Sequence, residues 1–139
     1  LLEVPALLRL DQLPVIHGTP PYGLYEHPAR IGAVPPHRTD TGAFMIAEVL
    51  GARSCILAKN VDGLFTADPV VNPDAELIRE IRADEVIGMN LDDLVLERMV
   101  LDLMQEAVNI REIRIVNCHV AGNVTAAVRG ERVGTLIRA

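Results

Sequence analysis

The segment Lys59–Pro69, KNVDGLFTADP, carries the most information about the fold and function of this chain. Asp62-Gly63 predicts a turn, because Asp hydrogen-bonds to its own backbone and Gly tolerates positive φ. Asp68-Pro69 predicts a second, rigid turn. An aromatic ring such as Phe65 beside a carboxylate at a strand end could hold a purine and a ribose hydroxyl. A structural double turn with Phe65 in the core is the alternative, and the spacing leaves both open.

Strand and helix patterns alternate on both sides of this segment. The expected strands are residues 13–17, 54–58, 77–81, 112–117 and 133–137, and the expected helices are residues 40–51, 83–89, 94–108 and 123–129. This alternation predicts a three-layer α/β/α fold with a largely parallel sheet. Such sheets bind ligands at the carboxyl ends of their strands. His17, Lys59 and Asn117 fall at or just past strand ends, so we expect them to face one crevice.

Composition restricts the class of protein. The 139 residues suit one domain or a large part of one, and 50% are apolar with only two Phe and two Tyr, so the core is aliphatic. The net charge of −6 and the absence of Lys/Arg runs argue against nucleic acid or anionic membrane as partners. No apolar run approaches the roughly 20 residues of a membrane span. We expect Cys55 and Cys118 to be buried thiols of a cytoplasmic protein.

The start of the chain and its longest loop are unusual. The sequence opens with LLEVPALLRL and without Met, so we expect residues 1–139 to be a single partial domain that lacks an N-terminal portion. Residues 18–39 form a Pro- and Gly-rich loop, of a length that is usually functional or disordered. At its end, helix N-terminal amides and Arg38 could attract an anion. Asp40 could act there, or could simply be the N-cap of the helix.

The segment KNVDGLFTADP resembles the VDG-(V/L)-(Y/F)-x-x-DP signature of uridylate kinases and their relatives in the amino-acid kinase superfamily. The resemblance implies that this chain is the C-terminal, nucleotide-binding part of that fold. The implied ATP-binding residues are Lys59, Asn60, Asp62, Gly63, Phe65 and Asp68. Among these, Asp62 and Gly63 shape the loop. The closing run from Asn117, with AGNVTAAVRGERVGTLI, resembles the superfamily ending, which supports family membership but no catalytic role, because a purely structural role explains these residues.

Thr39-Asp40 matches a Thr-Asp pair of uridylate kinases, which lies beside the acceptor nucleotide and the phosphate group that is transferred. The resemblance therefore implies catalytic roles for Thr39 and Asp40. Uridylate kinases carry a Gly-Asn-Pro-Phe-type sequence before this pair, whereas residues 35–38 here are Pro-Pro-His-Arg. This difference argues against uridylate as the acceptor.

Three further segments resemble the molybdenum storage proteins of the same superfamily, more the beta type than the alpha type. They are PPY … PPHRTDTGAF, VLDLMQEA (residues 100–107) and REIRIVN … VGTLIRA. The resemblance implies a cytoplasmic hetero-oligomer of two related subunits, expected to be a hexamer. Such an assembly uses ATP and Mg²⁺ to store molybdate or tungstate as oxide clusters.

Histidine and arginine side chains can hydrogen-bond to oxoanions. His17, Arg38 and His119 are therefore the candidate contacts for an oxometalate cluster, whereas His27 is expected to be an exposed loop residue. The four histidines share no zinc-ligand spacing, so a zinc site is not expected.

Two other functions stay open. One is a uridylate kinase-type phosphotransferase that converts UMP and ATP into UDP and ADP, and the other is a non-catalytic nucleotide-binding or assembly fragment. No two glycines here are adjacent or separated by one residue, and no GxxxxGK motif occurs. Phosphoryl transfer needs amides or Lys around the phosphates, and the resemblance places that Lys-x-Gly-Gly loop in a preceding N-terminal part. ATP turnover is expected only when that loop is present.

Overall fold

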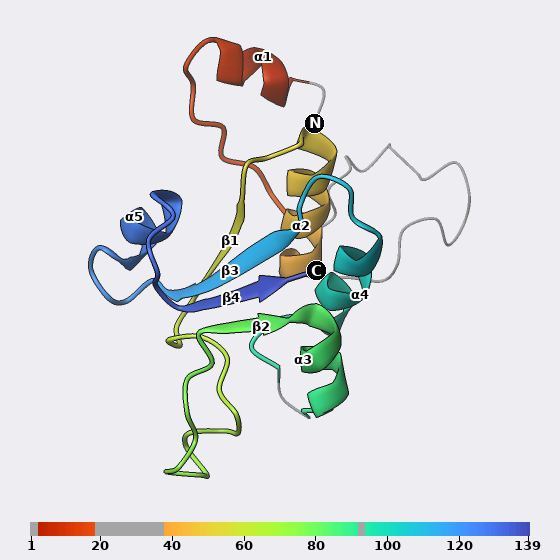
Figure 1. The fold of residues 1–139 in the computed structure, drawn as a ribbon. Coiled ribbons are helices and arrows are strands. Elements are labelled where there is room, and N and C mark those ends of the chain that lie inside the picture. The colour runs from red at the N-terminus through yellow and green to blue at the C-terminus, as the bar shows by residue number, and fades with distance from the viewer. Residues whose placement is uncertain (1–2, 19–37, 92–93) are drawn as a thin grey trace.

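The computed structural model describes residues 3–18, 38–91 and 94–139. Its elements are α1 (Val4–Arg9), α2 (Thr39–Leu50), β1 (Cys55–Lys59), β2 (Glu80–Arg82), α3 (Ala83–Met89), α4 (Arg98–Glu106), β3 (Glu112–Asn117), α5 (Asn123–Val128) and β4 (Thr135–Arg138) (Figure 1). Most of the Pro- and Gly-rich loop, including His27, lies outside the described residues. None of the helices in the described ranges is long and apolar enough to cross a bilayer.

The four strands form one sheet in the order β1-β3-β4-β2. The β1–β3 and β2–β4 pairs are parallel and the β3–β4 pair is antiparallel, so the sheet is mostly parallel, as predicted. Lys59 and Asn117 are partners in register. The carboxyl ends of β1 and β3 therefore meet at one edge, which confirms that these two residues lie side by side.

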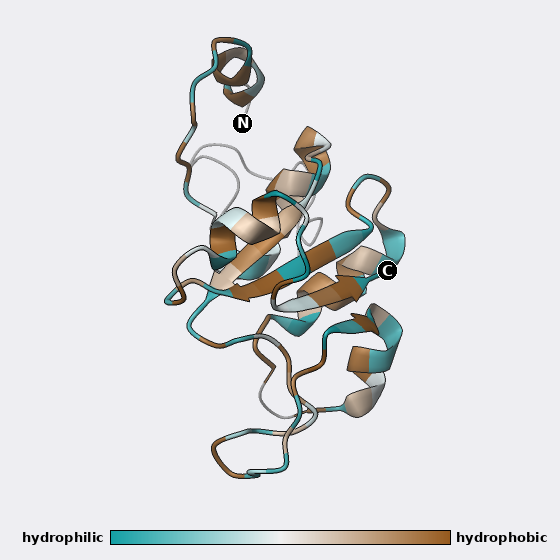
Figure 2. Ribbon diagram, turned by 60° about the vertical axis from the view of Figure 1, so that its left-hand side comes forward, coloured by the Kyte–Doolittle hydropathy of each residue, from teal (hydrophilic) through white to brown (hydrophobic). Residues whose placement is uncertain are grey.

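Helices cover both faces of the sheet. On one face α2, α3 and α4 enclose an aliphatic core in which Phe44, Val100 and Met104 pack with Leu57 and Ile115. On the other face α5 contacts β3 and β1 (Figure 1). Figure 2 shows that hydrophobic residues concentrate on the central strands and on the helix faces beside them. This arrangement confirms the three-layer α/β/α architecture.

Helix α2 begins earlier than the sequence predicts. Its N-cap is Arg38, in an extended conformation, and Asp40 lies inside the first turn. The interpretation of Asp40 as the cap is therefore wrong, and its carboxylate is used elsewhere. The helix stops at Gly51 with φ 59°, a left-handed conformation that favours glycine, as predicted.

The N-terminal segment differs most from expectation. Residues 13–17 form no strand. Pro14 lacks an N–H for a ladder, and Leu13 and Val15 are 89% and 93% exposed, so the segment buries no apolar face. The short helix α1, which has Pro5 in its first turn, was not expected and lies apart from the sheet (Figure 1).

Several elements begin or end at other residues than predicted, and one cysteine is exposed instead of buried. Helix α4 is shorter than predicted because Glu97 and Ala107 on either side of it are extended, and β2 and β4 begin later than predicted. Cys55 is buried, and burial, reinforced by the Asp40 carboxylate, raises the pKa of its thiol to about 11. Cys118 is exposed, contrary to expectation, because it follows the last residue of β3 at the sheet edge.

The carboxylate of Glu48 ties the end of α2 to the loop before β3. It accepts the N–H groups of Val108, Asn109 and Ile110 at 2.9, 3.0 and 2.7 Å. Burial alone would raise the pKa of Glu48, but these hydrogen bonds and nearby Arg111 outweigh it and lower the pKa below its usual 4.5.

We expect Glu48→Gln to lower the free energy of unfolding by about 1 kcal/mol near neutral pH, because an amide accepts fewer of these N–H groups and the site is partly exposed. A carboxyl group with a lowered pKa stabilises the fold above its unfolded-state pKa and loses that contribution as pH falls through the folded-state pKa. The difference from wild type should therefore shrink below about pH 4.5. Urea unfolding at neutral and acidic pH measures it, and a difference that does not change with pH would contradict this role.

Candidate functional site

Four residues singled out from the sequence, Lys59, Asp40, Asp62 and Asn117, lie together at the carboxyl ends of β1 and β3. Lys59, the last residue of β1, donates from Nζ to both carboxylate oxygens of Asp40 at 2.7 Å each. Their side chains are 23% and 14% exposed, so water screens this ion pair only partly. Helix α2 leads through the turn at Gly51 into β1, and this reversal brings the start of the helix to the end of the strand.

Glu97, the N-cap of α4, completes the cluster and was not anticipated. Its carboxylate accepts the Arg38 N–H at 2.6 Å and the Thr41 N–H at 2.9 Å, and its own N–H lies 3.3 Å from Asp40 Oδ2. Burial alone would raise the pKa of Glu97, but the hydrogen bonds from Thr41 and Arg38 outweigh it and lower the pKa. The negatively charged carboxylate of Glu97 therefore binds the backbone N–H groups at the N-terminus of α2.

A cavity of about 580 Å³ lies between the segment after β1 and the segment before α4. Its lining residues are Val61, Gly63, Leu64, Phe65, Ala67, Asp68, Pro69, Val70, Leu91 and Val95. A mostly apolar cavity of this size with a few polar groups is typical of a small-molecule site. Phe65 and Asp68 supply the aromatic ring and the carboxylate that the sequence predicted. Leu91 and Val95 were missed because no local motif marks them.

Thr135 anchors the loop that forms this cavity. Its buried hydroxyl accepts the Leu64 N–H at 2.8 Å and donates to the Ile78 carbonyl at 2.6 Å. Gly63 has φ 152°, and a Cβ there would lie 2.3 Å from the Thr135 hydroxyl oxygen. Only glycine therefore fits at this position, which explains why the loop carries Asp-Gly.

Asn117 connects β3 to the same loop. Its side-chain amide donates to Asp62 Oδ1 at 2.8 Å, and its Oδ1 accepts the His119 N–H at 2.9 Å. Asn123 Nδ2 donates to the Asn117 carbonyl at 3.2 Å. Asp62 is thus held at the sheet edge near Lys59, the register partner of Asn117.

The other residues predicted from the kinase resemblance make fewer contacts. Asp68 is exposed at the rim of the cavity, and its Oδ1 accepts the Val70 N–H at 2.8 Å, which forms the turn predicted there. Asn60 is exposed in the turn after β1. Thr39 lines a separate apolar hollow of about 410 Å³ beside α2. Their functional roles stay predictions.

The residues expected to contact oxometalates come from three segments. His17 lies in the stretch that forms no strand, and the next residue, Gly18, lies against Thr39 and Gly42 at the start of α2, so the place of His17 beside Lys59 and Asn117 stays a prediction. Arg38 is 85% exposed, with Nε 3.4 Å from a Glu97 oxygen, and His119 follows β3. Among the residues described, no three His, Cys, Asp or Glu side chains cluster as metal ligands. The oxometalate contacts stay predictions.

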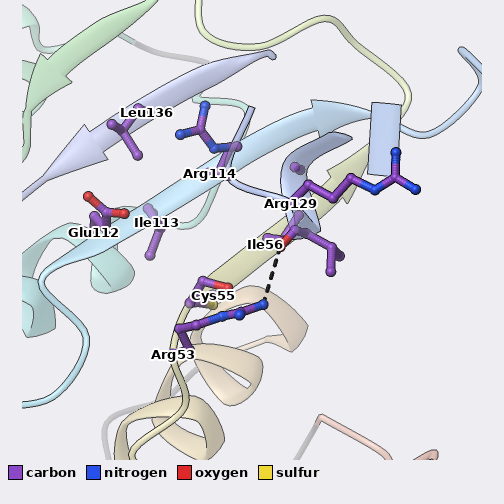
Figure 3. Close-up of a pocket in the computed structure, with 12 residues that line it drawn as sticks. Arg53, Cys55, Ile56, Glu112, Ile113, Arg114, Arg129 and Leu136 are labelled. Atoms are coloured by element: carbon purple, nitrogen blue, oxygen red, sulfur yellow. Dashed lines mark hydrogen bonds between the residues drawn. The ribbon is translucent and has the colours of Figure 1, made fainter. Parts of the chain in front are cut away.

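A second cavity, of about 500 Å³, lies at the opposite ends of β1 and β3, beside α5 (Figure 3). Arg53 crosses it and donates to the Val128 carbonyl at 3.2 Å. Glu112, at the start of β3, is also in its wall. Parallel sheets bind ligands at the carboxyl ends of their strands, and none of the predicted site residues lines this cavity. We therefore place the candidate site at the Lys59–Asp40 edge.

A sequence model described as the amino acid kinase family matches residues 2–121. This chain belongs to the amino acid kinase family. It is 46% identical over 136 residues to the molybdenum storage protein subunit beta of Azotobacter vinelandii, covering 98% of this chain and 50% of that protein. It is 42% identical over 106 residues to a uridylate kinase of Mycolicibacterium vanbaalenii, covering 75% of this chain and 40% of that protein. This member of the family thus spans about half the length of these relatives.

Solved structures of the family share the fold. A UMP kinase from Bacillus anthracis superposes with a TM-score of 0.67 at 27% identity, covering 77% of this chain and 43% of that one. A UMP kinase from Ureaplasma parvum gives 0.65 at 25% identity, covering 76% and 43%. The amino acid kinase fold predicted from the Lys59–Pro69 segment is therefore confirmed.

Proposed function

We propose that this chain is the nucleotide-binding portion of a molybdenum storage subunit that uses ATP to deposit molybdate or tungstate as oxide clusters. One observation supports nucleotide binding. The apolar cavity with Phe65 and Asp68 is lined by the segment that follows Lys59, and Lys59 is paired with Asp40 at the end of β1. The storage part is supported by the 46% identity to the molybdenum storage subunit, which extends over 98% of this chain. A related subunit completes the oligomer in the cytoplasm.

In this proposal the adenine packs against Phe65, a ribose hydroxyl donates to Asp68, and the triphosphate extends toward Lys59. Hydrolysis forms a bond between a water oxygen and the γ-phosphorus and breaks the bond to the β,γ-bridging oxygen, which leaves with ADP. Asp40 accepts the proton of the attacking water. The Lys59 ammonium group offsets the charge that develops on the phosphate oxygens. The amides that hold the phosphates come from outside the Lys59–Pro69 segment, since this sequence has no glycine-rich phosphate loop.

The residues at this edge fit Mg²⁺ as the companion of ATP. Mg²⁺ prefers oxygen ligands and takes most of them from phosphates and water, with few carboxylates from the protein. The carboxylates nearest the ends of β1 and β3 are Asp40 of α2, which accepts from Lys59, and Asp62 of the following loop, which accepts from Asn117. When bound, Mg²⁺ would neutralise part of the negative charge of the phosphates.

We expect Asp68→Ala to weaken ATP binding by roughly tenfold, which corresponds to about 1.4 kcal/mol and one lost charge-assisted hydrogen bond. Calorimetric titration of the full-length protein with its partner subunit measures this affinity. The matched variant Asp68→Asn keeps an acceptor for the Val70 N–H while removing the charge. Wild-type affinity in Asp68→Asn together with weak binding in Asp68→Ala would assign Asp68 to the turn alone, and unchanged affinity in both would remove it from the site.

The alternative function is phosphoryl transfer from ATP to UMP, favoured by the 42% identity to a uridylate kinase over 106 residues. Metal analysis of the full-length protein, purified with its partner from molybdate-fed cells, separates the two. Many molybdenum atoms per chain, retained with ATP, support storage. UMP-dependent ADP production without bound molybdenum supports the transferase. Nucleotide binding with neither result indicates a non-catalytic assembly role.

A further inference from the structure

We propose that Glu97 is a positioning residue, which fixes the first turn of α2 and so sets the orientation in which Asp40 holds Lys59. The proposal rests on the proposed ATP-dependent function, in which Asp40 and Lys59 act at the phosphates.

Glu97 makes one hydrogen bond with Asp40 and two with residues on either side of Asp40 in the chain. Its carboxylate accepts the amides of Arg38 and Thr41, before and after Asp40 in the chain, at 2.6 and 2.9 Å. Its own N–H points to Asp40 Oδ2 at 3.3 Å, on the carboxylate that accepts both hydrogen bonds from Lys59. The backbone around Asp40 and the carboxylate itself are thus fixed by one residue of another helix.

Burial indicates which of these contacts matter. The Glu97 side chain is 10% exposed, whereas its ionic partner Arg38 is 85% exposed and its Nε lies 3.4 Å away. Exposed ion pairs of this length contribute little, because water screens them. Hydrogen bonds from backbone amides to a shielded carboxylate are stronger, since one partner is charged. The two α2 amides therefore hold Glu97 in place, and through them Glu97 holds the helix start.

The chain offers a matched control at the other end of the same helix. Glu48 also accepts backbone N–H groups from a distant segment, those of residues 108–110, but it belongs to the last turn of α2. A Glu→Gln change at either position removes one charge and turns an acceptor oxygen into an N–H donor. Both changes weaken hydrogen bonds that hold α2, but only the change at Glu97 affects the first turn of the helix, which contains Asp40.

The first test compares kcat and KM for ATP in the full-length protein with its partner subunit. Glu97→Gln is expected to lower kcat by roughly ten- to a hundredfold, as a displacement of ~1 Å in a reacting group does, while KM for ATP stays within about twofold. Glu48→Gln is expected to keep the wild-type kcat with a lower Tm. The proposal is overturned if Glu97→Gln keeps wild-type kcat, or if both variants lose activity in proportion to their loss of folded protein.

The second test needs no turnover and separates this proposal from the proposed function. The ¹⁵N NMR signal of the Lys59 ammonium group reports its hydrogen bonds to Asp40. Glu97→Gln should shift this signal and Glu48→Gln should leave it in place. If the wild-type assembly hydrolyses no ATP, the proposed function fails, while the Lys59 shift still supports the positioning role. An unchanged Lys59 signal in Glu97→Gln overturns that role whatever the activity.

Discussion

Asp40→Asn is expected to lower ATP turnover by the full-length protein by roughly a thousandfold, because a positioned proton acceptor contributes about 10²–10⁴ to the rate. The substitution keeps the shape of the side chain but removes the charge that faces Lys59 Nζ at 2.7 Å. It also leaves the Lys59 ammonium group, which is 23% exposed, without its counter-ion. Steady-state kinetics at saturating ATP measure the loss.

A control variant separates chemistry from folding in this experiment. Asp74 is exposed in the loop between β1 and β2, so Asp74→Asn makes the same change of charge away from the site. We expect wild-type turnover from Asp74→Asn. If Asp40→Asn keeps turnover within about tenfold of wild type, Asp40 is excluded as the proton acceptor and serves only to hold α2 against β1.

Thr135→Val is expected to lower the free energy of unfolding by about 3 kcal/mol, although the two side chains have nearly the same shape. The change removes the partner of the Leu64 N–H and of the Ile78 carbonyl, and each buried unsatisfied group costs roughly 1–3 kcal/mol. Urea unfolding measures the difference. Because Thr135 anchors the loop that carries Phe65, we also expect weaker ATP binding.

Thr135→Ser is the matched control, since it keeps the hydroxyl and loses one methyl group. It should retain most of the stability and the nucleotide affinity. Equal losses in Thr135→Ser and Thr135→Val would show that the methyl group, packed in the core, matters more than the two hydrogen bonds.

Local sequence patterns predicted the elements whose own residues determine them. The bounds of α3 and β3 agree with the expected ranges, because each has a clear apolar period and a clear stop. The position of Lys59 at the end of β1 followed from the apolar run at residues 54–58, and the turn at Asp68-Pro69 followed from its Asp and Pro residues. These predictions needed only contacts between near neighbours in the chain.

The remaining features depend on segments that are distant in sequence. Glu97 contacts Thr41 across 56 positions and Thr135 contacts Leu64 across 71, and nothing local marks either residue as a partner. Asp40 has the side chain of a good helix cap, yet the helix starts before it because Glu97 satisfies the first amides instead. The apolar pattern of residues 13–17 is typical of a strand, but a strand also needs a neighbour, and the pattern does not supply one.

The cluster of Asp40, Lys59 and Glu97 joins the start of one helix, the end of one strand and the residue before another helix. If any one of these elements separates from the other two, a contact of the cluster is lost. Separation of α2 from β1 breaks the Lys59–Asp40 ion pair, and separation of α4 from α2 breaks the hydrogen bonds of Glu97. Under the proposed function, ATP turnover should consequently require all three elements to stay packed together, and it should be lost at a denaturant concentration no higher than that which unfolds the domain.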